Sequence, residues 1–500
     1  MLILVLSFCL FTSIKSWIKV GFGISPQPQF YPALDMQIKP KHPILLVPGM
    51  LSSKLESWSV IKDSCEKYPG QYFRSTIWSK FTGLFKWFFK GKCILDIFDL
   101  DVEEGRDSPK GYKVRAGAGF QAIDYFAGGF SVWAKVIGNL GAAGYDTANM
   151  AVVPYDWRLS YEMMETRDST FSKMKVEIEF MVKKSKEKAV ILTHSLGGNF
   201  NLYFIQWVNH LDPEWMNKHI HAWISNGTPF LGSVKPMSAV ITGYIQETAL
   251  SFVKVAMDSA MSADARQTVM SHLRSYYSVF PIGGNKIWGN ATYNPALQQP
   301  HVNSNDTVGG QVFTMFSDGK PVSTVNADDI QHAIIHKLHP NMQKFAKSLN
   351  YGSKVNATDS NSWFNPLASE LPKGDYTIYC AYGIGYPTAH SYALKSKNDR
   401  YDIELKSNTL GYKQGVATVD GDITVTLTSL GYVCESAWRT KRNNPHNVKI
   451  VTREYPDQDH LSLLQENNFL RDMLNIVGGK PVSQRIHSNI TAIVHQIDQK

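Results

Sequence analysis

The stretch that most constrains the fold is residues 189–198, Ala-Val-Ile-Leu-Thr-His-Ser-Leu-Gly-Gly, where a run of apolar and β-branched residues ends abruptly at Ser195. Such a run is typical of a buried strand. Residues 199–208 then show the spacing of a helix. A strand, a sharp turn at a serine and a helix together predict a nucleophile elbow, which presents the serine hydroxyl at the edge of a sheet.

The elbow needs small neighbours, because its strand and its helix approach each other closely at the turn. Gly197 satisfies this requirement, whereas Thr193 stands where the pattern G-x-S-x-G has its first glycine. A match of this length also describes an ordinary strand-to-helix turn, so the rest of the chain has to decide between the two interpretations.

Strand-like and helix-like stretches alternate on both sides of the elbow. Strands are expected at 43–47, 147–154, 222–225, 376–382, 415–419 and 448–452, and helices at 132–140, 171–181 and 461–477. This alternation predicts an α/β-hydrolase fold with a mostly parallel sheet. Residues 238–267 break the alternation and predict a lid-like insertion, and residues 282–354, rich in Asn, Gly, His and Pro, predict an irregular cap.

We therefore divide the chain into a signal peptide (1–16), a first core part (38–237), a cap or lid region (238–370), a second core part (371–478) and a polar tail (479–500). The first segment has a short apolar run followed by small and polar residues, but no basic start. No other stretch approaches the roughly 18 apolar residues of a membrane span. We expect a secreted or lysosomal protein whose tail is disordered or loosely attached.

The cysteines agree with a secretory route. Cys9 leaves with the signal peptide, and the four that remain permit three pairings. The local pairing joins Cys65 to Cys93 and Cys380 to Cys434 without crossing the chain, and four free buried thiols are the alternative. Glycosylation sequons, which also suit a secreted chain, begin at Asn290, Asn305, Asn356 and Asn489.

Residues 65–93 form an aromatic and basic stretch with helical spacing. This composition predicts an amphipathic helix at a membrane interface, in the hairpin that a Cys65–Cys93 bond would close, and a core helix with outward-reaching lysines is the alternative. The net charge of +8 is compatible with anionic membranes and too modest for a nucleic-acid-binding footprint. The side chains expected to contact the membrane are Trp78, Phe81, Phe85, Trp87 and Phe88.

A serine nucleophile needs a base and a carboxylate that orients the base. In α/β-hydrolases these two groups follow the serine in the order Asp, His. Asp422 lies in a turn directly after the strand expected at 415–419, and His460 lies in the loop between the last strand and the last helix. Asp420 and Asp459 are the near alternatives for the carboxylate, and Asp422 is preferred over Asp420.

The negative charge that develops on an ester oxygen needs two backbone N–H groups pointing at one spot. The amide of Leu196, directly after the nucleophile, is one candidate. The turn after the first core strand supplies the other, at Met50, although a plain strand-ending turn is equally compatible with Pro48-Gly49.

With these residues placed, the chain resembles the lecithin:cholesterol acyltransferase family, which includes the lysosomal phospholipase A2 enzymes. The matching pieces, in the family's order from about residue 43 to 477, are Leu46-Val-Pro-Gly49 with Leu55-Glu56, Pro154-Tyr-Asp-Trp-Arg158, His194-Ser-Leu-Gly197, Cys380-Ala-Tyr-Gly383 with Pro387-Thr388, Asp420-Gly-Asp422 with Thr424-Val425, and His460-Leu461. The resemblance implies a nucleophile at Ser195, an acid at Asp422, a base at His460, oxyanion donors at Met50 and Leu196, and both local disulfides.

Three features depart from the family pattern. Thr193 replaces a small residue, residues 226–232 lack the family's Trp-Gly pair, and the hairpin is longer and more aromatic. The lipid preference of the hairpin is therefore not carried over.

The resemblance implies a serine acyl-esterase or acyltransferase that cleaves a fatty acyl ester of a glycerophospholipid and passes the acyl group to water or to a lipid alcohol, a sterol or ceramide. No metal is expected, because the sequence shows no clustered His/Asp ligand set and the proposed triad has its own base, and no cofactor is expected. The expected partners are a phospholipid membrane or lipoprotein surface and the acyl acceptor, with no nucleic acid, for a monomer that associates peripherally with membranes. A hydrolase of neutral lipids or soluble esters and an inactive lipid-binding protein are the alternatives.

Overall fold

The computed structural model describes residues 31–60, 72–78, 93–126, 130–245, 261–298, 309–354, 356, 358–397, 400–408 and 411–500. Its central element is a six-stranded parallel sheet with the strand order β16-β12-β9-β8-β1-β7. These strands are β1 (Ile44–Val47), β7 (Met150–Val152), β8 (Ala189–His194), β9 (Ile220–Asn226), β12 (Thr377–Ile384) and β16 (Lys449–Pro456). The predicted α/β fold with a parallel sheet is confirmed.

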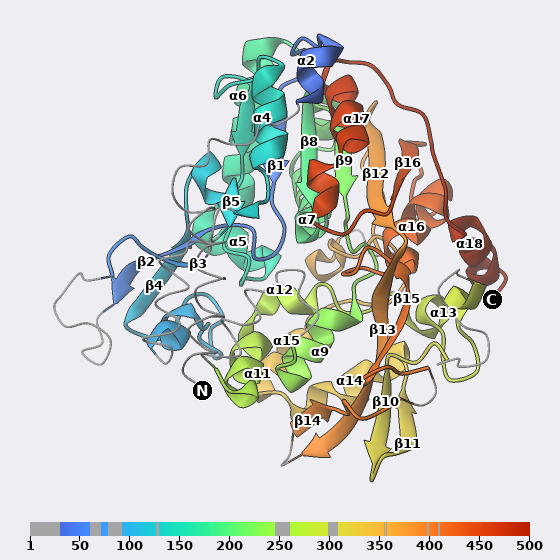
Figure 1. The fold of residues 1–500 in the computed structure, drawn as a ribbon. Helices are drawn as coiled ribbons and strands as arrows, with labels where there is room; N and C mark the ends of the chain where they lie inside the picture. Colours follow the sequence, from blue (N-terminus) through green and yellow to red (C-terminus); the bar gives the residue numbers. More distant parts are fainter. Residues whose placement is uncertain are drawn as a thin grey trace, which may run out of the picture.

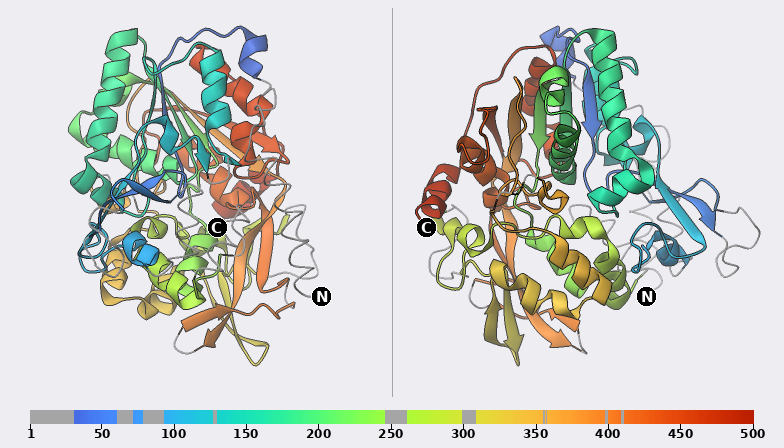
Figure 2. Two further views of the ribbon diagram at one scale, coloured as in Figure 1. Left: turned by 60° about the vertical axis from the view of Figure 1, so that its left-hand side comes forward. Right: turned by 180° about the vertical axis from the view of Figure 1, so that it is seen from behind.

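Helices cover both faces of this sheet, which explains why every residue of β1 and β8 is buried. One face carries α2 (Pro32–Met36), α4 (Ala134–Ala142) and α17 (Asn467–Val477), and the opposite face carries α6 (Thr170–Ser185) and α7 (Leu196–Leu211) (Figures 1 and 2). Among the shorter helices, α5 (Tyr161–Asp168) contacts α6, α8 (Trp215–His219) contacts α6 and α7, and α16 (Leu427–Glu435) contacts β12 and β16.

A second, five-stranded sheet lies at the lower end of the molecule in Figure 1. It contains β10 (Phe313–Ser317), β11 (Lys320–Val325), β13 (Tyr386–Lys397), β14 (Arg400–Ile403) and β15 (Val416–Gly421). The strand expected at 415–419 therefore exists, but it pairs antiparallel with β13 and does not join the parallel sheet. Its pairing partner is the twelve-residue β13, a strand that the sequence periodicity did not indicate.

The cap region is more regular than its composition suggests. Beside the second sheet it contains α9 (Val234–Thr242), α11 (Ala263–His272), α12 (Arg274–Tyr277), α13 (Gly284–Trp288), α14 (Ile330–Ala333) and α15 (Pro340–Ser348). These helices lie below the carboxyl ends of the parallel strands (Figure 1). In an α/β sheet that end is where ligands bind. No helix among the described residues has both the length and the apolar character needed to cross a bilayer.

A three-stranded sheet of β2 (Leu55–Val60), β3 (Ser75–Trp78) and β4 (Tyr112–Ala116) projects to the left in Figure 1, near the two-stranded pair β5 (Tyr125–Phe126) and β6 (Phe130–Ser131). Trp78 ends β3, and the prediction that it contacts the membrane is wrong. Its side chain is only 2% exposed, and its Nε1 donates to the Leu51 carbonyl at 2.8 Å. Ring contacts to Phe98 and Trp157 with centroids 5.6–5.7 Å apart hold it in the core.

The other predicted lipid contacts, Phe81, Phe85, Trp87 and Phe88, lie outside the described residues. So does Cys65, and its pairing with Cys93 stays a prediction. The second predicted disulfide, Cys380–Cys434, is present and joins β12 to α16.

The expectation of a loosely attached tail is wrong. Residues 490–498 form α18 (Ile490–Asp498), which contacts α16, and its Ile490, Ile493 and Ile497 are fully buried. The buried carboxylate of Glu454 accepts hydrogen bonds from the backbone N–H groups of His487 and Ser488. Apolar anchors and one buried acceptor therefore attach a segment whose composition is mostly polar.

Candidate active site

Ser195 lies at the sharp turn between β8 and α7. Its backbone adopts φ 55° and ψ −130°, a strained conformation for a residue with a side chain. The Ser195 N–H donates to the Asn226 carbonyl at 2.9 Å, and the Gly198 N–H donates to the Ser195 carbonyl at 2.8 Å. The turn thus has the strained geometry of the predicted nucleophile elbow.

The close approach expected at Gly197 is present. A Cβ at this position would lie 2.6 Å from the Pro48 carbonyl oxygen and 2.7 Å from that of Val47, so only glycine is tolerated. The unusual Thr193 is accommodated on the other side of the turn. It is fully buried, and its hydroxyl accepts a hydrogen bond from Trp223 Nε1 at 3.0 Å.

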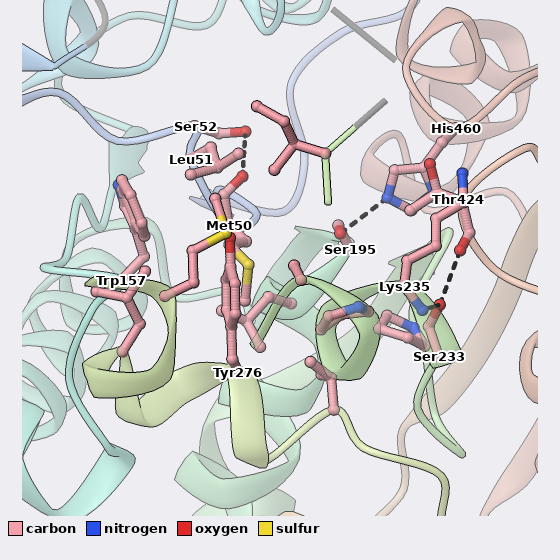
Figure 3. A pocket seen from close by; sticks show the side chains of 18 of the residues that line it. Met50, Leu51, Ser52, Trp157, Ser195, Ser233, Lys235, Tyr276, Thr424 and His460 are labelled. Atoms are coloured by element: carbon pink, nitrogen blue, oxygen red, sulfur yellow. Dashed lines mark hydrogen bonds between the residues drawn. The ribbon is translucent and has the colours of Figure 1, made fainter. Parts of the chain in front are cut away.

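His460 follows β16 in the chain and lies beside the serine. Its Nε2 is 2.8 Å from Ser195 Oγ (Figure 3), and its Nδ1 is 2.6 Å from Asp422 Oδ2. The His460 backbone N–H also donates to the Asp422 carbonyl at 2.9 Å, which fixes the two loops relative to each other. The three side chains form a continuous relay in which the serine donates to the imidazole and the imidazole donates to the carboxylate.

The structure separates the three candidate carboxylates. Asp422 is fully buried, and its second oxygen accepts from the Thr424 and Val425 backbone N–H groups at 3.0 and 2.7 Å. Asp459 instead accepts from backbone N–H groups of its own loop, at 2.8 and 2.9 Å.

Asp420 also bonds to backbone N–H groups and not to the imidazole of His460. Its Oδ1 accepts from the N–H groups of Gly385 and Gly421, each at 2.8 Å. It therefore braces the turn between β12 and β13, next to the position that Asp422 occupies. Among the described carboxylates, Asp422 is the one that bonds to His460.

The two predicted oxyanion donors and Ser195 line the same cavity. A Cβ built on Gly49 would lie 2.8 Å from Ser195 Cβ, so the turn that carries Met50 touches the nucleophile. Leu196 is the first residue of α7, where backbone N–H groups have no partner within the helix. Within the described ranges neither the Met50 nor the Leu196 N–H has a protein acceptor, so both are available to a developing negative charge.

His194 is a residue of the site that sequence reasoning missed. Its Nε2 donates to the His460 backbone carbonyl at 2.8 Å, and the two ring centroids are 4.8 Å apart. Burial is the main cause that lowers the pKa of His194, to about 3, so the ring stays neutral and keeps this donor role. Its position directly before Ser195 in a buried strand was the available signal.

A cavity of about 240 Å³ opens beside Ser195 and His460, between the parallel sheet and the cap (Figure 3). Its wall is mainly apolar and comes from both regions. Residues that line it include Met50, Leu51, Trp78, Phe98, Phe126, Trp157, Leu196, Ala239, Ile245, Met261, Val269, Met270, Leu273, Tyr276, Val279 and Val425. An apolar cavity of this kind suits the hydrocarbon part of a lipid.

Two polar side chains near the relay are used to hold the wall together. Ser233 donates to the Thr424 carbonyl at 3.0 Å (Figure 3), and the Lys235 ammonium donates to the Ile423 carbonyl. Both contacts attach the start of α9 to the loop that carries Asp422. Among the described residues, no group of three His, Cys, Asp or Glu side chains is placed to hold a metal ion. The arrangement supplies a nucleophile, a base, an orienting carboxylate and oxyanion donors, which together can transfer an acyl group.

Comparison with known proteins agrees with this chemistry. A family model described as lecithin:cholesterol acyltransferase matches residues 72–478. The phospholipid:diacylglycerol acyltransferase of Schizosaccharomyces pombe is 32% identical over 491 residues, which cover 91% of this chain and 76% of the relative. The protein of the same name from Saccharomyces cerevisiae is 30% identical, with 93% and 74% covered. The phosphatidylcholine-sterol acyltransferase of Mus musculus is 24% identical, with 87% and 85% covered.

Proposed function

The chain belongs to the lecithin:cholesterol acyltransferase family and is an O-acyltransferase, and from this premise we propose that it transfers a fatty acyl group from a glycerophospholipid to the hydroxyl of a diacylglycerol through an ester on Ser195. The observation that carries the proposal is the relay from Ser195 through His460 to Asp422 at the mouth of an apolar cavity.

The first half of the reaction acylates the enzyme. Ser195 Oγ attacks the ester carbonyl carbon while its proton passes to His460 Nε2. The N–H groups of Met50 and Leu196 stabilise the charged oxygen of the tetrahedral intermediate. Collapse of that intermediate breaks the bond to the glycerol oxygen, which takes the proton from His460 and leaves as a lysophospholipid.

The second half transfers the acyl group to the acceptor. The acceptor hydroxyl gives its proton to His460 and attacks the acyl-serine, which yields triacylglycerol and regenerates Ser195. Asp422 stabilises the imidazolium that forms in both halves. The apolar wall of the cavity favours a lipid alcohol over water as the second substrate.

The preference for diacylglycerol rests on the relatives. The two yeast proteins and one from Arabidopsis thaliana, all named phospholipid:diacylglycerol acyltransferases, are 29–32% identical and align with more than nine-tenths of this chain. The mouse sterol acyltransferase is 24% identical. Diacylglycerol therefore replaces sterol and ceramide as the first acceptor to test.

Product analysis tests this proposal. We expect the label from phosphatidylcholine with a labelled acyl chain to appear in triacylglycerol when the vesicles contain diacylglycerol. Vesicles with cholesterol, with ceramide or with no added alcohol serve as matched controls. Label found mainly in free fatty acid or in sterol ester, with diacylglycerol present, would contradict the proposed acceptor.

Access to such substrates requires contact with a membrane, and the three-stranded sheet offers a surface for it. Trp58 and Phe73 are 41% and 60% exposed, and their rings meet edge to face with centroids 5.8 Å apart. The Arg74 guanidinium lies 5.8 Å from the Trp58 ring centroid. Exposed aromatics beside a basic group suit a lipid–water interface. Trp78, in the same sheet, lines the cavity.

Replacing both Trp58 and Phe73 by alanine is expected to weaken binding to anionic vesicles about ten-fold, or about 1.4 kcal/mol, because the apolar area placed in the interface is lost. Cosedimentation with phosphatidylserine-containing vesicles measures this. Phe180→Ala is the matched control, since Phe180 is 58% exposed but lies on α6, away from the three-stranded sheet (Figure 1). Equal losses in both variants would contradict a specific docking surface.

The cellular location is also a proposal. The Cys380–Cys434 disulfide supports an oxidising compartment, because such bonds persist in secreted proteins and in the endomembrane lumen. We propose a secreted, lysosomal or other lumenal enzyme that associates peripherally with membranes.

A further inference from the structure

Tyr276 is a cavity residue that the acyl-transfer mechanism does not use. It lies on α12 and lines the same cavity as Ser195 and His460. Figure 3 shows its ring extending from the helix into the cavity, in the direction of Met50. Its side chain is buried, with 7% exposed. The polar end of this side chain therefore faces the space that the substrate occupies.

The Tyr276 hydroxyl makes no hydrogen bond within the described part of the chain. Burial alone raises its pKa, and no hydrogen-bond partner contributes to the shift. The hydroxyl therefore keeps its proton throughout the physiological range and is available as a donor.

The neighbouring Tyr277 shows the usual outcome for a buried tyrosine. It lies on the same short helix and is fully buried, but its hydroxyl donates to the Ser271 carbonyl at 2.7 Å. It does not line the cavity. The two adjacent tyrosines thus differ in one respect that matters here, namely whether the protein supplies an acceptor.

Three other polar side chains of the wall are already bonded to protein. Ser233 and Lys235 bond to the loop that carries Asp422, and the Arg266 guanidinium donates to the Gly243 and Met261 carbonyls at 2.9 and 2.8 Å. The Tyr276 hydroxyl opens into the cavity, and the few polar groups placed in an apolar pocket commonly bond to its ligand and fix the orientation of that ligand. In an otherwise apolar cavity, an oxygen atom of the bound substrate is the natural acceptor.

We propose that the Tyr276 hydroxyl donates a hydrogen bond to an ester or hydroxyl oxygen on the glycerol backbone of the lipid in the cavity. Tyr276 is then a specificity-determining residue that favours glycerol esters over esters of other alcohols. The inference rests on the proposed function, in which both the acyl donor and the acceptor are glycerolipids. The oxygen belongs either to the phospholipid or to the diacylglycerol.

A pair of esters with the same acyl group isolates this contact. Tributyrin and p-nitrophenyl butyrate both deliver a butyryl group to Ser195, but only tributyrin has glycerol oxygens. The ratio of their kcat/KM values does not depend on the fraction of folded enzyme. We expect Tyr276→Phe to lower this ratio about ten-fold, the usual effect of leaving a buried substrate oxygen without its donor.

Tyr277→Phe is the matched control, and its ratio is expected to equal that of the wild type, since the Tyr277 hydroxyl bonds to the protein itself. Phosphatidylcholine vesicles then identify the source of the oxygen. If Tyr276→Phe slows the release of lysophosphatidylcholine in vesicles that contain no diacylglycerol, the oxygen belongs to the donor lipid. A loss confined to triacylglycerol formation assigns it to the acceptor.

Two quantities are compared between Tyr276→Phe and the wild type: the ratio of kcat/KM for tributyrin to kcat/KM for p-nitrophenyl butyrate, and the rate of triacylglycerol formation divided by the rate on p-nitrophenyl butyrate. The inference is wrong if neither quantity changes by more than two-fold. This failure differs from a failure of the proposed function. A wild-type enzyme that cleaves tributyrin but forms no triacylglycerol from phosphatidylcholine contradicts the proposed function, while the tributyrin ratio still tests the role of Tyr276.

Discussion

Replacing Ser195 by alanine is expected to lower kcat for acyl transfer by a factor on the order of 10⁶, the loss typical of a serine nucleophile that acts within a triad. The hydroxyl is the group that forms the covalent ester, and its Oγ lies 2.8 Å from the only base that the relay contains. Initial rates with labelled phosphatidylcholine and diacylglycerol measure the effect.

The folded state and membrane binding provide the controls for this variant. Because the serine side chain is small and alanine keeps its Cβ, the melting temperature and vesicle affinity should stay near those of the wild type. Residual activity within ten-fold of the wild type, in a folded protein, would show that another residue forms the ester.

The second largest effect is expected for Asp422→Asn, at about 10⁴-fold in kcat. The carboxylate accepts the His460 Nδ1–H at 2.6 Å and is fully buried, so no water can replace it. An amide in this place favours the wrong imidazole tautomer and does not stabilise the imidazolium. The pre-steady-state rate of reaction with a fluorophosphonate, followed together with kcat, measures the loss at the acylation step.

Asp420→Asn is the matched control, two residues away. The carboxylate of Asp420 accepts two backbone N–H groups, and an amide oxygen can still accept both. We expect a loss of less than about ten-fold, because the contact braces a turn and does not touch the base. The reverse ranking of the two variants would mean that the orienting carboxylate is misassigned.

The relay could be predicted from sequence because each of its members follows a strand, and the order of strands fixes the order of the groups. Ser195 follows β8, His460 follows β16, and Asp422 follows β15. Strand β15 shows where the local sequence pattern is insufficient. Its alternation indicates a strand, but the choice between the parallel sheet and β13 is made by long-range pairing.

The errors have physical reasons of the same kind. The helical spacing that begins at Ile77 suggested a lipid-facing helix, but Ile77 and Trp78 end a strand that is buried on both faces. Aromatic composition does not distinguish a membrane surface from a core made of several small sheets. The exposed aromatics, Trp58 and Phe73, precede the aromatic-rich spacing that begins at Ile77.

The tail shows the opposite error. Ile490, Ile493 and Ile497 have the spacing of one helix face, but they stand among polar residues that dominate the composition of the segment. Their burial depends on the surface of α16, which the local sequence does not reveal. His194 was missed for a related reason, since its bond to the His460 carbonyl joins residues 266 positions apart.

Ser195 is expected to carry the acyl group on its way from phospholipid to diacylglycerol. The direct measurement is to mix the enzyme with labelled phosphatidylcholine, stop the reaction in acid before acceptor is added, and sequence the proteolytic peptides by mass spectrometry. We predict one acylated peptide, modified at Ser195, whose label moves into triacylglycerol when diacylglycerol is added before the acid. Acyl transfer that proceeds at the full rate with an unmodified Ser195 peptide, or a label fixed on another residue, would show that Ser195 does not carry the acyl group.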